Sequence, residues 1–235
     1  MNNILIFGAS GHGSVVLDII ESQGQYKPIG FLDTYKRKGP KKNGYEILGN
    51  TKDLPYLIEK FNIYGGIVAI GDNWIRQAMV NRIKKVIPEF RFVSAVHPTA
   101  NIGKDVRIGN GSVIMPGVIV NANSVIGRHC ILNTLSSLGH DGQMADFSSL
   151  APRVGVGGNF QLGYCSAISI GTNVIENVSI EMHTVVGAGS LVINDIPGYK
   201  VAYGSPAKII RNREIGESYL ALNRSQVKRT VPDEL

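Results

Sequence analysis

The sequence predicts an α/β domain over residues 1–95, followed by an all-β domain over residues 96–210 that winds as a coil of short parallel strands. Two observations predict this division. In the first part, short apolar runs alternate with amphipathic segments. In the second part, an aliphatic residue recurs at every sixth position. Residues 211–235 form a C-terminal extension, in which residues 215–226 fit either a short helix or a segment without fixed structure.

The first part reads as three strand–helix units. Strands are expected at residues 4–7, 29–33 and 65–73, and helices at residues 14–24, 53–62 and 74–86. Strands that alternate with helices form a parallel sheet with helices on its faces. The expected domain is therefore a small Rossmann-like one.

A glycine-rich turn, GASGHG at residues 8–13, joins the first strand to the first helix. Such turns aim backbone N–H groups and a helix N-terminus at a phosphate. The spacing of Gly8, Gly11 and Gly13 is not the strict dinucleotide fingerprint, and a plain tight turn is the alternative.

Two further residues support a nucleotide site at the same edge of the sheet. Asp33 ends the second strand, 25 residues after Gly8, where a carboxylate can hold a ribose hydroxyl. Gly71 ends the expected third strand at the carboxyl edge, where open α/β sheets bind ligands. One such half-domain favours a nucleotide over a complete dinucleotide.

The six-residue repeat of the second part has no insertion. Its sixteen positions are Ile102, Ile108, Ile114, Val120, Ile126, Leu132, Leu138, Met144, Leu150, Val156, Leu162, Ile168, Val174, Ile180, Val186 and Val192. This period fits neither a helix nor a strand of an open sheet. It fits a triangular coil with three short strands per turn, each of which gives one aliphatic side chain to a narrow interior.

Composition limits the partners. The net charge is +6, but the positive residues are not gathered into one helix or arm, which favours small polyanions such as nucleotides or coenzyme A over nucleic acid. The basic run KRKGPKK at residues 36–42 is either solvated or attracts nucleotide phosphates. The N-terminal region lacks the pattern of a signal peptide or a membrane span, so a cytoplasmic protein is expected.

Seven motifs carry a resemblance to a known family: GASGHG at Gly8, FLD at Phe31, AIGDNWIR at Ala69, VHPTA at Val96, LNT at Leu132, GHD at Gly139 and GSPAKII at Gly204. Over residues 3–211 the chain resembles the NeuD/PglD-like family of sugar O- and N-acyltransferases. The resemblance implies a homotrimer of left-handed parallel β-helices of the hexapeptide-repeat type, with acetyl-CoA in the groove between neighbouring subunits. It also implies that the N-terminal domain holds the nucleotide of a nucleotide-linked amino sugar.

The resemblance also implies roles for individual residues. His140 would be the catalytic base and Asp141 the acid that tunes it. The implied nucleotide-sugar contacts are Ser10, Gly11, His12, Asp33 and Gly71. The implied coenzyme A contacts are Ser149, Gly158, Ile170 and Ala188. The expected reaction is N-acetylation of a nucleotide-linked sugar, of the 4-amino-4,6-dideoxy type, for surface glycan synthesis.

Three positions depart from the PglD-like branch. Asp141 replaces a Glu, and its shorter reach is expected to weaken the contact with His140. Thr34 stands where a second Asp often follows Asp33, which leaves the base preference open. Ser149 stands where a His contacts the coenzyme.

The chemistry of acetyl transfer suits these residue types. A neutral imidazole can take the proton of an attacking amine, and a neighbouring carboxylate fixes its tautomer and raises its basicity. Gly158 lies 18 residues, or one coil, after His140, so its N–H is expected about 4.8 Å away and is the predicted oxyanion donor. The alternative for His140 is a solvated corner of the coil.

Other histidines have simpler interpretations. His129 and His183 lie three coils apart, about 14 Å by strand spacing, so they cannot share one metal ion and are expected to be structural or solvated. No metal is expected in this site. His12, inside the glycine-rich turn, is the predicted phosphate or sugar contact.

Two other functions remain open. One is O-acetylation of sialic acid or a related nonulosonic acid, as in the NeuD-like branch. The other is a non-catalytic trimeric scaffold that binds a nucleotide and uses the coil only to assemble.

Overall fold

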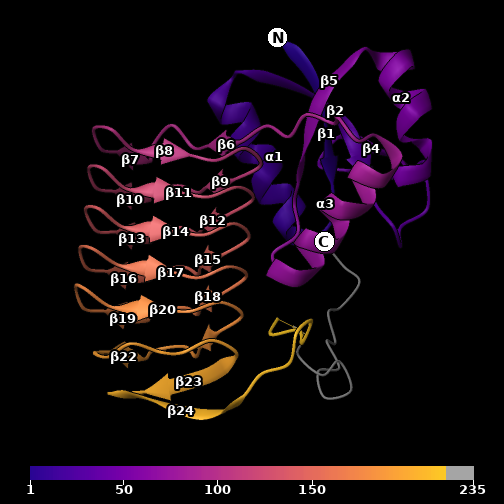
Figure 1. Ribbon diagram of the computed structural model, residues 1–235. Helices are drawn as coiled ribbons and strands as arrows, with labels where there is room; N and C mark the ends of the chain where they lie inside the picture. Colours follow the sequence, from indigo (N-terminus) through magenta and orange to yellow (C-terminus); the bar gives the residue numbers. More distant parts are fainter. Residues whose placement is uncertain (221–235) are drawn as a thin grey trace, which may run out of the picture.

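The computed structural model describes residues 1–220. Figure 1 shows a tall coil of stacked rungs with a helix-covered sheet beside its upper part. The described part of the chain contains no helix that is long and apolar enough to cross a membrane.

The N-terminal domain is a five-stranded sheet in the order β3-β4-β2-β1-β5. Neighbouring strands run parallel except for the pair β3 and β4. The strands are β1 (Asn2–Phe7), β2 (Tyr26–Leu32), β3 (Lys41–Lys42), β4 (Tyr45–Gly49) and β5 (Ile63–Val68). The helices are α1 (Gly11–Gln23), a short 3₁₀ turn η1 (Thr51–Asp53), α2 (Leu54–Phe61) and α3 (Asn73–Val86).

The predicted alternation of strands and helices is confirmed, with three corrections. β2 ends at Leu32, so Asp33 is the first residue after the strand and does not end it. β5 ends at Val68, so Gly71 lies in the loop before α3 and does not end a strand. The basic run is not only a loop, because its last two lysines form β3 in a hairpin with β4. The turn of that hairpin is Asn43–Gly44, with φ of 48° and 83°, a pair that favours this tight turn.

Each strand of the coil is two residues long, and the strands stack into three parallel sheets. The first sheet holds β7 (Asn101–Ile102), β10 (Ile119–Val120), β13 (Ser137–Leu138), β16 (Gly155–Val156), β19 (Asn173–Val174) and β22 (Leu191–Val192). The second holds β8 (Arg107–Ile108), β11 (Val125–Ile126), β14 (Gln143–Met144), β17 (Gln161–Leu162) and β20 (Ser179–Ile180). The third holds β6 (Ala95–Val96), β9 (Val113–Ile114), β12 (Ile131–Leu132), β15 (Ser149–Leu150), β18 (Ala167–Ile168) and β21 (Val185–Val186), and is closed by the hairpin of β23 (Lys200–Gly204) and β24 (Ala207–Asn212).

The six-residue repeat forms the core of this coil, as predicted. The second residue of each strand points inward, and the register pairs residues 18 apart, such as Leu138 with Val156. All the predicted core residues from Ile114 to Val192 are buried. Ile102 and Ile108 are only half-buried, because the first turn of the coil has no turn above it to cover them.

A buried arginine joins the two domains. Arg76 of α3 is fully buried, and its guanidinium donates from Nε to the carbonyl of His129 at 2.8 Å and from Nη2 to the carbonyl of Phe147 at 3.0 Å. Its Nη1 donates to the carbonyls of Ile70 and Gly71, both at 2.9 Å. Arg76 therefore fixes the loop after β5 against one edge of the coil.

The two histidines of that edge are packing residues. The ring of His129 stacks on Phe147 with a centroid distance of 4.9 Å, and the ring of His183 stacks on Tyr199 at 5.3 Å. Only 4% of His129 and 6% of His183 is exposed. The structural interpretation of both histidines, rather than the solvated one, therefore agrees with their positions.

After β24 the chain returns to the N-terminal domain. Residues 215–220 contain a turn and a bend and no helical turn, so this part of the predicted short helix is wrong. Residues 221–226 of that prediction lie outside the described residues.

Candidate active site

The turn between β13 and β14 carries the candidate base and its acid. His140 Nδ1 lies 2.7 Å from Asp141 Oδ2. Asp141 has a φ of 56°, in the left-handed region that Asp and Asn tolerate better than most residues. The shorter side chain of Asp141 therefore reaches His140, and the expected weakening relative to Glu stays a prediction.

A second hydrogen bond holds Asp141 from the preceding turn of the coil. Asn123 stands 18 residues earlier, and its Nδ2 donates to Asp141 Oδ1 at 3.2 Å. The hydrogen bond from His140, followed by that from Asn123, lowers the pKa of Asp141. The carboxylate therefore stays ionised and favours the His140 tautomer with its proton on Nδ1, which leaves Nε2 free to accept a proton.

Gly158 makes room for the imidazole. A β-carbon at Gly158 would lie 2.4 Å from His140 Nε2 and 2.6 Å from Cε1, so any side chain here would displace the ring. Within residues 1–220 the Gly158 N–H has no hydrogen-bond acceptor, whereas the next N–H, of Asn159, donates to the His140 carbonyl at 2.8 Å. The predicted position of Gly158 against His140 is confirmed, and the role of its N–H as the oxyanion donor stays a prediction.

The glycine-rich turn has the geometry of an anion site. Ser10 is the N-cap of α1, and the Ser14 N–H donates to the Ser10 carbonyl at 3.2 Å. The preceding helical N–H groups, including that of Gly11, have no intrahelical acceptor. Gly13 packs so closely against Gly8, the first residue after β1, that a β-carbon would lie 2.2 Å from the Gly8 carbonyl oxygen.

Asp33 already has three backbone partners. Its Oδ2 accepts from Ala9 N–H at 2.8 Å, and its Oδ1 accepts from the N–H groups of Tyr35 and Lys36 at 2.9 and 3.1 Å. Burial would raise the pKa of Asp33, but these hydrogen bonds and the charge of Lys36 outweigh burial and lower it. Asp33 therefore ties the loop after β2 to the glycine-rich turn, and its predicted ribose contact stays a prediction.

A cavity of about 390 Å³ lies between the two domains and combines both groups of predicted contacts. His12 and Gly71 line it from the N-terminal domain, and Ser149 and Ile170 line it from the coil. The other predicted contacts lie outside its lining: Ser10, Gly11, Asp33, Gly158 and Ala188.

His12 is neutral in this cavity. Burial, followed by the positive charge of Arg76, lowers the pKa of His12 to about 4. Its Nε2 is buried and has no hydrogen-bond partner among the described residues. A neutral ring with a free nitrogen suits a hydroxyl or amide of a ligand better than it suits ion pairing with a phosphate.

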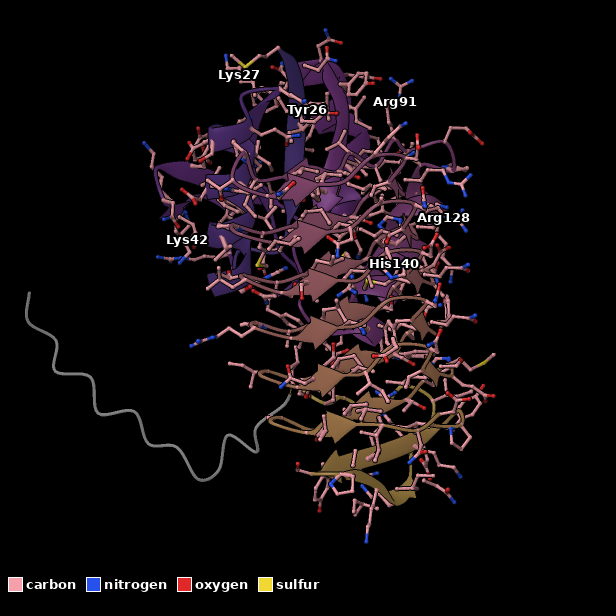
Figure 2. The ribbon with its side chains drawn as sticks, turned by 90° about the vertical axis from the view of Figure 1, so that its left-hand side faces the viewer. Tyr26, Lys27, Lys42, Arg91, Arg128 and His140 are labelled. Atoms are coloured by element: carbon pink, nitrogen blue, oxygen red, sulfur yellow. The ribbon has the colours of Figure 1, made fainter. Side chains whose placement is uncertain are left out.

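His140 is remote from this cavity within one chain. It lies in the turn between β13 and β14, at the corner between the first and second sheets, whereas the cavity borders β12, β15 and β18 of the third sheet. Figure 2 shows His140 on the face turned to the viewer, with the N-terminal domain behind the coil. One chain therefore does not bring the candidate base to the candidate pocket.

Two residues of this region were not predicted. Arg76 lies within the motif AIGDNWIR, which marks the segment but does not indicate the contact of the arginine with the coil. Tyr219 lines the cavity from the C-terminal extension, where the sequence carries no motif.

A Rossmann-like domain with a glycine-rich turn, joined to a six-residue-repeat coil with a histidine–acid pair on one corner, defines the class of hexapeptide-repeat acyltransferases. Comparisons with known proteins agree. The family model described as PglD N-terminal domain matches residues 3–83, and that described as bacterial transferase hexapeptide (six repeats) matches residues 99–134.

Solved structures match nearly the whole chain. PerB from Caulobacter crescentus, in complex with CoA and GDP-perosamine, is 33% identical with a TM-score of 0.83, over 90% of this chain and 98% of that one. The acetyltransferase domain of PglB from Neisseria gonorrhoeae FA1090, in complex with acetyl coenzyme A, is 30% identical with a TM-score of 0.82, over 89% and 100%. GDP-perosamine N-acetyltransferase from Escherichia coli O157:H7 is 29% identical over 212 residues, 87% of this chain and 84% of that protein.

The chain belongs to the NeuD/PglD-like family of sugar acyltransferases. The predicted fold, with its left-handed β-helix, and the predicted acetyltransferase class are confirmed by these relatives.

Proposed function

We propose that this chain transfers the acetyl group of acetyl-CoA to the amino group of a nucleotide-linked sugar. The observation that carries the proposal is the likeness over 90% of the chain to PerB, whose structure holds CoA and GDP-perosamine. The arrangement of His140, Asp141 and Gly158 supports it, because this is the set of groups that such a transfer needs.

In the proposed mechanism the sugar amine attacks the thioester carbonyl directly. As the N–C bond forms, His140 Nε2 takes a proton from the nitrogen, while Asp141 holds Nδ1–H and stabilises the imidazolium. The Gly158 N–H donates to the developing oxyanion. The C–S bond then breaks, and the proton on His140 passes to the coenzyme A thiolate.

The active site is proposed to lie between subunits of a homotrimer. His140 and the interdomain cavity lie on different sides of the coil, so a site that uses both needs His140 from one subunit and the cavity of another. Co-expression of inactive His140→Ala and His12→Ala chains tests this arrangement. A shared site is active only when one subunit supplies an intact His140 and the other an intact His12. Random mixing gives about one such site in four, so it should restore about a quarter of wild-type activity. No recovery would contradict the shared site.

The reaction itself is tested by thiol release from acetyl-CoA. We expect turnover with nucleotide-linked 4-amino sugars and none with free nonulosonic acids. Turnover of the free acid alone would favour the O-acetyltransferase alternative. An absence of transfer to every amino sugar, together with nucleotide binding, would favour the scaffold.

A further inference from the structure

The C-terminal extension contributes to the cavity through a segment that we call the strap, residues 213–220. Arg213, of which 5% is exposed, donates from Nη1 to the carbonyl of His183 at 3.0 Å. Ser218 Oγ donates to Asp72 Oδ2 at 3.0 Å, at the N-cap of α3. The strap is thus anchored at both ends, once to the coil and once to the N-terminal domain.

The strap places the hydroxyl of Tyr219 between the N-terminal domain and the coil, at the cavity. This hydroxyl lies 3.4 Å from the Gly71 carbonyl oxygen and 3.3 Å from Ser149 Oγ. Both contacts are long for hydrogen bonds that involve a hydroxyl, so a bound ligand can replace either one at little cost. Leu220 also lines the cavity, and a β-carbon at Gly71 would lie 3.3 Å from Leu220 Cδ1.

The cavity suits the uncharged part of a nucleotide sugar. No lysine or arginine lines it among the described residues, and most of its wall is apolar. Phosphate groups are better held by the free N–H groups at the start of α1, where Ser10 and Gly11 do not line the cavity. The polar groups that remain include neutral ones spread around the wall: His12, Ser149 and Tyr219.

Tyr219 keeps its proton in this environment. Burial is the main cause that raises the pKa of its phenol, and the hydroxyl therefore acts as a neutral donor and acceptor at physiological pH. An apolar wall with a few neutral hydrogen-bonding groups is how proteins bind a deoxysugar ring and fix its orientation.

We propose that Tyr219 is a specificity-determining residue, whose hydroxyl binds the sugar ring of the nucleotide-linked amino sugar while the strap closes the pocket around it. The proposal rests on the proposed function for the identity of the ligand. It adds a substrate contact from a segment beyond Arg211, where the family resemblance of the sequence ends.

Binding measurements separate the sugar from the nucleotide. Dissociation constants of the nucleotide-linked amino sugar and of the matching nucleoside diphosphate would be measured by calorimetry for wild type and Tyr219→Phe. Tyr203→Phe is the matched control, because Tyr203 is half exposed on β23 and does not line the cavity. We expect Tyr219→Phe to weaken binding of the nucleotide sugar about 3- to 10-fold, as for loss of one hydrogen bond, and to change binding of the nucleoside diphosphate less than about 2-fold.

Three outcomes would overturn the proposal: unchanged affinity for the nucleotide sugar, equal weakening of both ligands, or tighter sugar binding by Tyr219→Ala, which would mean that the strap blocks the pocket. Each of these presupposes a wild-type protein that binds and acetylates the sugar. A wild-type protein that does neither contradicts the proposed function instead, so the two failures are distinguishable.

Discussion

The imidazole of His140 lies directly against the α-carbon of Gly158, one coil further along the chain. A β-carbon at Gly158 would come within 2.4 Å of His140 Nε2, the atom that the proposed mechanism uses as base. The closest atoms belong to the far end of a largely exposed side chain, which can swing away without disturbing the backbone.

Gly158→Ala is therefore expected to leave the fold intact and to lower activity. We expect kcat to fall by about 10- to 100-fold, because a misplaced base loses much of its effect. The measurement is thiol release together with the melting temperature. Gly155→Ala is the control, since a β-carbon there meets the Asn173 side chain at 3.0 Å and the Ser137 hydroxyl at 4.0 Å, and no part of His140. Equal activity of the two variants would contradict the role of this contact.

Asp141→Asn tests the carboxylate that orients the base. The variant keeps the size and the turn conformation but loses the charge that favours a proton on His140 Nδ1. We expect kcat to fall by about 10²-fold or more at neutral pH. The pKa of Asp141 is lowered, so in the wild type the carboxylate stays charged until the pH falls below the ordinary range of aspartate. A variant with the kcat and the pH profile of the wild type would remove Asp141 from the mechanism.

His129 makes stability depend on pH. Burial, followed by the charge of Arg76, lowers its pKa to about 3, whereas an unfolded chain has the ordinary histidine value near 6.5. Between these values the unfolded state binds a proton that the native state lacks, so the free energy of unfolding falls by about 1.4 kcal/mol for each unit that the pH is lowered. Above pH 6.5 this contribution is constant.

Replacement of His129 by phenylalanine should flatten this dependence. The variant keeps an aromatic ring between Phe92 and Phe147 but cannot be protonated. Urea unfolding at several pH values from 4.5 to 7 is the measurement, with His97→Ala as control. A weaker dependence of the same sign remains in the variant, because His12, with its pKa lowered to about 4, still takes up a proton on unfolding. An unchanged slope in His129→Phe would contradict this assignment.

Arg76→Lys is expected to weaken the contact between the domains. Lysine keeps the charge but cannot reach the carbonyls of His129, Phe147 and Gly71 at once. Leaving buried carbonyls without donors should cost at least about 3 kcal/mol of unfolding free energy. Arg82→Lys on the same helix is the matched control, because Arg82 is exposed and has one long bond, at 3.3 Å, to Thr34. Equal unfolding midpoints for the two variants would contradict the role of Arg76.

The sequence predicts the coil almost residue by residue because one aliphatic side chain per strand is a strict requirement of its narrow interior. A shift of register would expose Leu138 or Val156, so the period leaves no alternative. The contact of His140 with Gly158 follows from the same register, since residues 18 apart must stack.

Features that depend on less regular backbone were not predictable in this way. The sequence does not predict the β3–β4 hairpin, although Asn43–Gly44 is a recognisable turn, because the short strands carry little apolar pattern. The sequence predicts an end of β5 that is too late, because the apolar run continues through Ile70 after strand pairing has stopped at Val68.

Long-range polar contacts are the hardest features to predict from the sequence. The partners of Arg76 outside its own helix are backbone carbonyls, which every residue has. Its side-chain partner, Asn73, lies three residues earlier and does not indicate the contact with the coil. Tyr219 and Gly71 are 148 positions apart in the sequence. They come into contact because the strap returns to the N-terminal domain.

His140→Ala, with thiol release measured at saturating acetyl-CoA and nucleotide-linked amino sugar, tests the central claim most directly. Removal of the general base should lower kcat by about 10²- to 10⁴-fold, while both substrates still bind and the melting temperature stays near that of the wild type. A kcat within about 2-fold of the wild-type value would contradict the account, because no proposed step could then depend on proton transfer to His140.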